Sequence, residues 1–156
     1  MSIDLPHPSI ESPRLLDPEE LAAWRGLLRA HSRLSRALDA DLERTHGLPL
    51  TSYEVLVFLA DSPDGRLRMA ELADSVLLSR SGLTRLVDRM ARAGLLRRER
   101  CPSDARGTFA VITPRGRELF DRARVTHLKG VREMFLERFS REELRTFAAL
   151  WAKAGG

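Results

Sequence analysis

A cluster of arginines in the middle of the sequence supplies side chains that can bind phosphate groups and guanine bases. A guanidinium donates paired hydrogen bonds to either group, which a lysine ammonium does not. The chain has 156 residues and a net charge of +4, and 24 of its 26 basic residues are arginine. A G·C-rich genome explains that overall excess equally well, so the distribution of the arginines matters more. Eight of them lie between residues 79 and 107 against three acidic residues, which gives this segment a net charge of +5. Such a concentration favours a phosphate-binding surface.

The first of these arginines fall on a predicted helix that Ser79 caps and that ends near Ala93, before Gly94. An apolar stripe with the spacing i, i+3, i+4, i+7 predicts its buried side. This stripe consists of Leu83, Leu86, Val87 and Met90. Small polar residues and arginines, which suit the major groove of DNA, fall largely on the other side. The residues expected to contact DNA from this helix are Ser79, Arg80, Ser81, Gly82, Thr84, Arg85 and Arg89. An ordinary surface helix would explain the arginines but not a glycine in the first turn, which costs about 1 kcal/mol relative to alanine.

A predicted β-hairpin follows this helix and carries more of the arginines. Two short strands, LLRRER and TFAVI, flank the loop CPSDARG, whose proline and glycine favour a turn. Arg97, Arg98 and Arg100 lie on the first strand, and Arg106 lies near the tip. An arginine at such a tip can enter the minor groove, where the potential is most negative. Asp104 can orient the Arg106 guanidinium through a charge-assisted hydrogen bond.

Other helices are predicted on both sides of this segment. Residues 1–16 contain three prolines and no periodicity, which predicts a flexible N-terminal arm. A helix of nearly 30 residues follows from Asp17, and its length indicates that it also packs on a partner. Further helices are expected at about 52–61 with Thr51 as its cap, at 69–76, at 114–139 and over about 12 residues after Ser140. This order predicts a mainly α fold, a winged helix-turn-helix with a small β-hairpin wing.

The stretch DARGTFAVITPRG, from Asp104 to Gly116, resembles the wing signature of the MarR family (multiple antibiotic resistance regulators). The preceding SRSGLTRLVDRMARAGLLRRE resembles the recognition helix and first wing strand of that family. The resemblance implies a homodimeric winged-helix transcription factor, usually a repressor. It implies that the recognition helix lies in the major groove, that Asp104 holds Arg106 in the minor groove, and that Arg97 and Arg98 contact phosphates.

The same resemblance implies a division of the chain into two regions. Residues 48–113 would form the DNA-binding region, and residues 17–47 and 114–156 would form a helical dimerisation region. A two-fold dimer would present recognition helices roughly 34 Å apart, so the operator should be a pseudo-palindrome. The residues expected at the dimer interface are Leu21, Phe135, Leu136, Phe139, Leu144, Phe147, Leu150 and Trp151. A core within one chain is the alternative for this set.

In this family a small aromatic or phenolic ligand often binds between the two regions and lowers the affinity for the operator. The candidates for ligand contacts here are Trp24, His31, Tyr53 and Phe58, each of which also fits an ordinary core or interface position. Some relatives sense oxidants through a cysteine. Cys101 lies at the wing base, where neighbouring arginines would favour its thiolate. We expect a bystander thiol, with a cysteine-based redox regulator as the alternative.

Composition and spacing disfavour several other classes of function. No apolar run of about 18 residues and no signal peptide are visible, and a single cysteine fits a cytoplasmic protein, so no membrane partner is expected. The four histidines show no metal-ligand spacing, and no Gly-rich phosphate loop is present. We therefore expect no metal, no cofactor and no enzymatic activity. A winged-helix adaptor that binds a protein instead of DNA is the remaining alternative, and the set Arg80, Arg85 and Arg106 argues against it.

Overall fold

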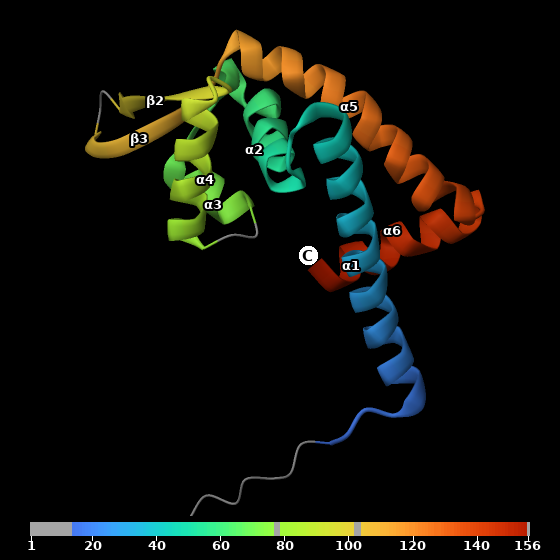
Figure 1. The fold of residues 1–156 in the computed structure, drawn as a ribbon. Helices are drawn as coiled ribbons and strands as arrows, with labels where there is room; N and C mark the ends of the chain where they lie inside the picture. The colour runs from blue at the N-terminus through green and yellow to red at the C-terminus, as the bar shows by residue number, and fades with distance from the viewer. Residues whose placement is uncertain (1–13, 77–78, 102–103, 156) are drawn as a thin grey trace, which may run out of the picture. The chain divides into compact units, whose positions relative to one another are not determined.

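The structure, a computed structural model, describes residues 14–76, 79–101 and 104–155 (Figure 1). The helices in these residues are α1 (Pro18–His46), α2 (Leu50–Asp61), α3 (Met69–Ser75), α4 (Arg80–Arg92), α5 (Pro114–Met134) and α6 (Arg141–Gly155). The strands are β1 (Arg66–Arg68), β2 (Leu96–Cys101) and β3 (Asp104–Ile112). The chain divides into two compact units, residues 1–32 and residues 33–156, and α1 contributes to both. Within the described residues, no helix is long and apolar enough to cross a membrane.

The three strands form one antiparallel sheet in the order β1-β3-β2. The predicted hairpin is the β2–β3 pair, called the wing hairpin below (Figure 1). Strand β1 was not predicted from the sequence, because three residues are too few for a period-2 pattern to be recognised. Its residues pair with the inner end of β3, so that Arg66 lies opposite Val111 and Arg68 opposite Phe109. Strand β1 therefore anchors the wing hairpin to the segment between α2 and α3.

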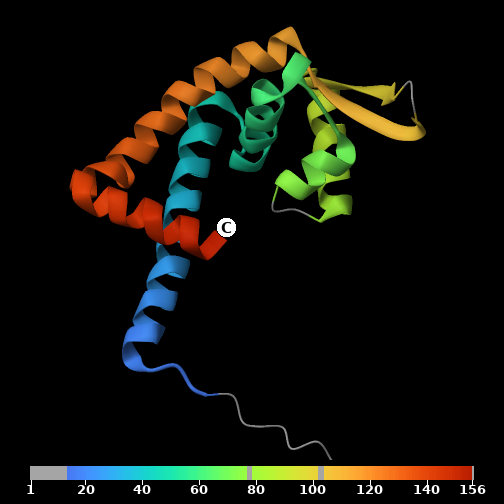
Figure 2. The ribbon, with the colours of Figure 1, turned by 180° about the vertical axis from the view of Figure 1, so that it is seen from behind.

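One hydrophobic core holds the second unit together. Helix α2 lies between α5 on one side and α3 on the other, and the two opposite views agree on this arrangement (Figures 1 and 2). Its apolar side chains Val55, Leu56 and Leu59 are fully buried. Because α2 is apolar around much of its circumference, it can pack on both neighbours at once. The elements that carry the arginines are thus fixed to a common core.

Several predicted helix starts are confirmed by their hydrogen bonds. The amides of Glu19 and Glu20 donate to Oδ1 of Asp17 at 2.8 and 2.9 Å. Ser140 and Glu143 form the expected capping box, in which each backbone amide donates to the other side chain. The backbone amide of Ser140 and, to a lesser extent, its hydroxyl lower the pKa of the Glu143 carboxyl, because they stabilise its charged form.

Two predicted helix boundaries are wrong. Thr51 does not cap α2, which begins at Leu50 after Pro49. The Leu50 amide instead donates to Oδ1 of Asp39 in α1 at 2.7 Å, so a side chain from another helix satisfies this end. Helix α5 stops at Met134 instead of about residue 139, because Phe135 leaves the helical conformation (φ −128°, ψ −64°). A short 3₁₀ turn, Leu136–Arg138, follows.

Candidate nucleic-acid interface

Helix α4 separates its apolar and polar side chains as predicted. Its stripe of Leu83, Leu86, Val87 and Met90 is buried in the core. The exposed side chains on the remaining surface include Ser81, Thr84, Arg85 and Arg89. The side chain of Arg80 lies outside the part of the structure that is described. The exposed side of the helix therefore combines arginines with hydroxyl groups, a set that can bond phosphates and base edges.

The start of α4 explains its first-turn glycine. Oγ of Ser79 accepts a hydrogen bond from the Gly82 amide at 3.1 Å, which confirms the predicted cap. A Cβ atom at residue 82 would lie only 3.1 Å from this same oxygen. Glycine therefore leaves room for the capping hydroxyl. Beyond the last turn, Gly94 has φ +72°, a conformation that glycine adopts without strain.

Arg97 and Arg98, the two arginines expected to bind phosphates, both have acidic partners within the chain. Nη2 of Arg97 lies 2.6 Å from Oε1 of Glu99, two residues along the same strand. Nη2 of Arg98 lies 2.8 Å from Oδ1 of Asp88 in α4. Adjacent residues of a strand point to opposite faces of a sheet, so the side chains of Arg97 and Arg98 lie on different faces.

The outer end of the wing hairpin contains Asp104 and Arg106. Both belong to β3, and Asp104 lies opposite Cys101 across a register irregularity. The side chains of Asp104 and Arg106 lie outside the described part of the structure. Their expected pairing, and the position of Arg106 in a minor groove, stay predictions.

Cys101 is buried at the outer end of β2, opposite Asp104, instead of at the wing base where the sequence placed it, because β2 extends through residue 101. Nη2 of Arg68 donates a hydrogen bond to its sulfur at 3.3 Å. The guanidinium of Arg68 also lies 5.6 Å from the centre of the Phe109 ring. The arginine beside the thiol thus comes from β1, the strand that the sequence analysis missed.

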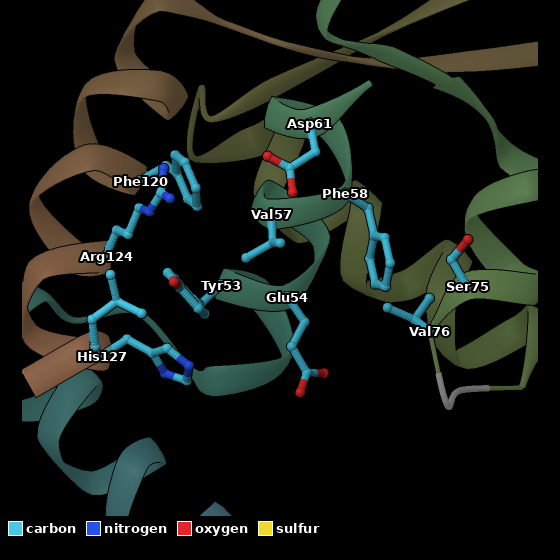
Figure 3. Close-up of a pocket in the computed structure, with 11 residues that line it drawn as sticks. Tyr53, Glu54, Val57, Phe58, Asp61, Ser75, Val76, Phe120, Arg124 and His127 are labelled. Carbon is cyan, nitrogen blue, oxygen red and sulfur yellow. The ribbon is translucent and has the colours of Figure 1, made fainter. Parts of the chain in front are cut away.

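A cavity of about 460 Å³ opens among α2, α5 and the end of α3 (Figure 3). Two of the four predicted ligand contacts, Tyr53 and Phe58, line it. The other two, Trp24 and His31, belong to the unit of residues 1–32 and are exposed. Residues of α5 that were not predicted as ligand contacts complete the cavity, and they include Phe120, Arg124 and His127. Their spacing of four and three residues on one helix was the available signal.

The cavity combines aromatic rings with a few polar groups. The Tyr53 ring lies 5.8 Å from that of Phe120 and 4.6 Å from that of His127. Burial raises the pKa of Tyr53; Arg124 opposes this shift and Asp61 adds to it. Burial lowers the pKa of His127, whose Nδ1 has no hydrogen-bond partner among the described residues. Both side chains are therefore neutral near pH 7. Such a lining can hold a small aromatic molecule. No cluster with metal-ligand composition occurs in the described ranges.

The apolar residues expected at a dimer interface fall into two groups. Phe135, Phe139, Phe147 and Trp151 form a chain of ring contacts between the end of α5 and α6. These contacts partly fit the alternative of a core within one chain. Leu144 and Leu136 are half-buried, whereas Leu150 and Trp151 keep 55% and 48% of their surface exposed.

The first half of α1 also exposes apolar side chains. Within residues 14–32 no side chain is buried, and Leu21 is the one half-buried residue. Trp24 and Leu28 are 52% and 49% exposed on the same stripe. Neighbouring large apolar side chains left in water on one helix face mark a surface suited to a protein partner.

Comparisons with known proteins agree with this geometry. Residues 46–107 match the model of the MarR family. The HTH-type transcriptional regulator MhqR of Bacillus subtilis (strain 168) is 30% identical over 129 residues, which cover 83% of this chain and 86% of that protein. The crystal structure of Sco3205, a MarR family transcriptional regulator from Streptomyces coelicolor in complex with DNA, matches with a TM-score of 0.86 and 39% identity, covering 91% of this chain and 89% of that chain. AbsC, a MarR family transcriptional regulator from the same organism, matches with a TM-score of 0.83 and 37% identity over 89% of this chain and 93% of that chain. The mainly helical fold with a three-stranded wing sheet is thus the winged helix of these regulators.

Proposed function

The chain belongs to the MarR family of transcriptional regulators, and on that premise we propose that it is a homodimeric repressor of a pseudo-palindromic operator. The observation that carries the proposal is the exposed side of α4, where Thr84, Arg85 and Arg89 stand opposite the buried stripe. Helix α4 enters the major groove, and the wing hairpin reaches the adjacent minor groove with Arg106. The relative Sco3205, which has the same fold, was solved with DNA. Because the proposed target of this chain is chromosomal DNA, we place the protein in the cytoplasm.

The exposed apolar surfaces support the dimer. One surface lies on the first half of α1, around Trp24 and Leu28, and the other on α6, around Leu150 and Trp151. Each belongs to a region that the sequence assigned to dimerisation. A second copy covers both surfaces and brings two α4 helices onto one side of the DNA.

The cavity beneath α2 supports a small aromatic effector. Its lining contains Tyr53, Phe58 and Phe120 together with the neutral imidazole of His127. The cavity is lined by α2, α5 and the end of α3, and α3 leads into α4. A bound molecule can therefore favour a different spacing between α5 and α3. A ligand that binds the non-DNA-binding arrangement more tightly shifts the population and releases the operator.

Selection and sequencing of DNA bound by the purified full chain tests this proposal. We expect one enriched pseudo-palindrome with half-sites about ten base pairs apart. Replacing Arg85 by alanine should weaken binding to it by about 1–3 kcal/mol. Arg122→Ala removes the same charge from an exposed ion pair on α5 and is the matched control, with affinity unchanged.

Recovery of DNA without any enriched sequence, or an equal loss in both variants, would contradict the proposal and favour a winged-helix adaptor. The same selected operator then serves for the effector. A panel of neutral phenols, aromatic carboxylates and aromatic amines is added to the complex, and release is followed by fluorescence anisotropy. At least one class should release the wild-type protein, and Phe58→Ala should raise the concentration needed.

A further inference from the structure

We propose that Arg98 is a positioning residue that fixes the wing hairpin to α4 through Asp88, instead of a phosphate contact. The inference rests on the proposed function, since its effect is expressed in DNA binding. It differs from the role that the family resemblance implied for Arg98.

The register of the sheet directs Arg98 toward the body of the protein. Arg98 lies opposite Ala110 on β3, and Ala110 lies opposite Leu67 on β1. Directly opposed residues project from the same face of a sheet. Ala110 is fully buried and Leu67 packs against the core, so this face is the inner one. The Arg98 side chain therefore runs along the inner face toward α4.

Arg98 makes two contacts with α4, on successive turns of the helix. Its Nη2 lies 2.8 Å from Oδ1 of Asp88 and donates a second hydrogen bond, 3.4 Å long, to the backbone oxygen of Thr84. The side chains of Arg98 and Asp88 are 33% and 45% exposed, so solvent screens the pair only in part. Arg97, in contrast, pairs with Glu99 on its own strand.

This geometry gives the pair a mechanical consequence. Helix α4 and the wing hairpin must fit a major groove and the adjoining minor groove at the same time, so the angle between them affects affinity. The residues of the hairpin that belong to the hydrophobic core are Leu96, Ala110 and Ile112, and these contacts are apolar and not directional. The Arg98–Asp88 pair adds a directional, charge-assisted contact that holds β2 against α4.

Removing the negative charge of Asp88 should change the affinity for DNA in opposite directions under the two roles of Arg98. A negative charge on a helix that faces DNA repels phosphates. If Arg98 bound a phosphate, removing that charge with Asp88→Asn would leave affinity unchanged or raise it. If the pair positions the wing hairpin, the same change weakens binding.

The experiment measures binding of the full chain to its selected operator by fluorescence anisotropy at several salt concentrations. The variants are Asp88→Asn, Arg98→Gln and the two combined, with folding verified by circular dichroism. We expect each single variant to bind about tenfold more weakly, and the double variant to bind no more weakly than Arg98→Gln, as for two residues that act through one contact. The dependence of affinity on salt should keep the wild-type slope, because no phosphate contact is lost.

Two further variants complete the design. Asp88→Glu keeps the charge and should bind within about threefold of the wild type, since an ion pair can re-form. Glu118→Gln removes one acid from an exposed pair on α5 and should leave affinity unchanged. Undiminished binding by Asp88→Asn, or a salt slope reduced by about one in Arg98→Gln, would refute the positioning role alone. A wild-type chain that selects no operator would overturn the proposed function and this inference with it.

Discussion

Gly116, the last residue of the wing signature, has a packing role that its position between two arginines does not suggest. Gly116 lies in the first turn of α5, where Oγ1 of Thr113 accepts a hydrogen bond from its amide at 3.0 Å. The Thr113 hydroxyl donates to the Gly94 oxygen at 2.6 Å. A Cβ atom on Gly116 would collide with the Leu95 carbonyl oxygen and would meet Ile112 Cγ1 at 3.2 Å. The Thr-x-x-Gly pattern therefore joins α5 to the turn before the wing.

Replacing Gly116 by alanine should lower the free energy of unfolding by about 2 kcal/mol, because the methyl group overlaps backbone that cannot move freely. Gly26 gives the matched control, since it lies in α1 with no atom within 4 Å of an added Cβ. Its position in the helix is opposite the Trp24–Leu28 stripe. Gly26→Ala should raise stability by about 0.5–1 kcal/mol. Urea denaturation at one protein concentration measures both, and an equal effect of the two changes would contradict the packing role.

At the scale of elements, the start of α2 depends on α1. Asp39 supplies the acceptor for the Leu50 amide, and Thr51 lies inside the helix. This bond joins the last turns of α1 to the helix that fills the centre of the core. The end of a long helix thus helps to fix where α2 begins.

Asp39→Ala should destabilise the protein by about 1 kcal/mol, the usual cost of losing a side-chain cap. Thr51→Ala, at the position that the sequence favoured as the cap, should change stability by less than about 0.5 kcal/mol. Thermal or urea denaturation of both variants measures the difference. A larger loss at Thr51 than at Asp39 would show that the hydrogen bond from the Leu50 amide to Asp39 contributes little.

At the scale of the whole molecule, the described part of the single chain exposes apolar side chains on α1 and on α6. Leu150 is 55% exposed on α6, beside the ring of Trp151. A monomer would keep these side chains in water, whereas a dimer removes them from it. The proposed function needs that dimer, because one recognition helix reads only half of a pseudo-palindrome.

Leu150→Glu should shift the protein from dimer to monomer in light scattering coupled to size-exclusion chromatography, because a carboxylate cannot be buried unpaired at an apolar interface. Operator affinity should fall at the same time. Ala149→Glu introduces the same charge at the neighbouring exposed position, away from the apolar side of α6, and should leave the dimer intact. A dimer that survives Leu150→Glu at micromolar concentration would exclude this part of α6 from the interface.

Local sequence determined which segments of this protein form helices, and which side of α4 is apolar and which is polar. Caps such as Ser79 and stripes such as Leu83 to Met90 act between residues three or four apart, so their outcome follows from the order of residues alone. Two short strands around a loop with proline and glycine predicted the wing. The expected dimer came from the family resemblance and stays a proposal. The helices and the wing, together with the exposed residues Thr84, Arg85 and Arg89, could be predicted before any coordinates.

Only the tertiary structure decided which distant groups meet. Strand β1 exists because β3 offers it partners more than 40 residues further along the chain. Asp39 reaches Leu50, Arg98 reaches Asp88, and α5 completes the cavity beside Tyr53 through packing of the common core. The sequence pattern reports how polar a side chain's position is, but the identity of its partner depends on the register of strands and the packing of helices, which no local spacing encodes.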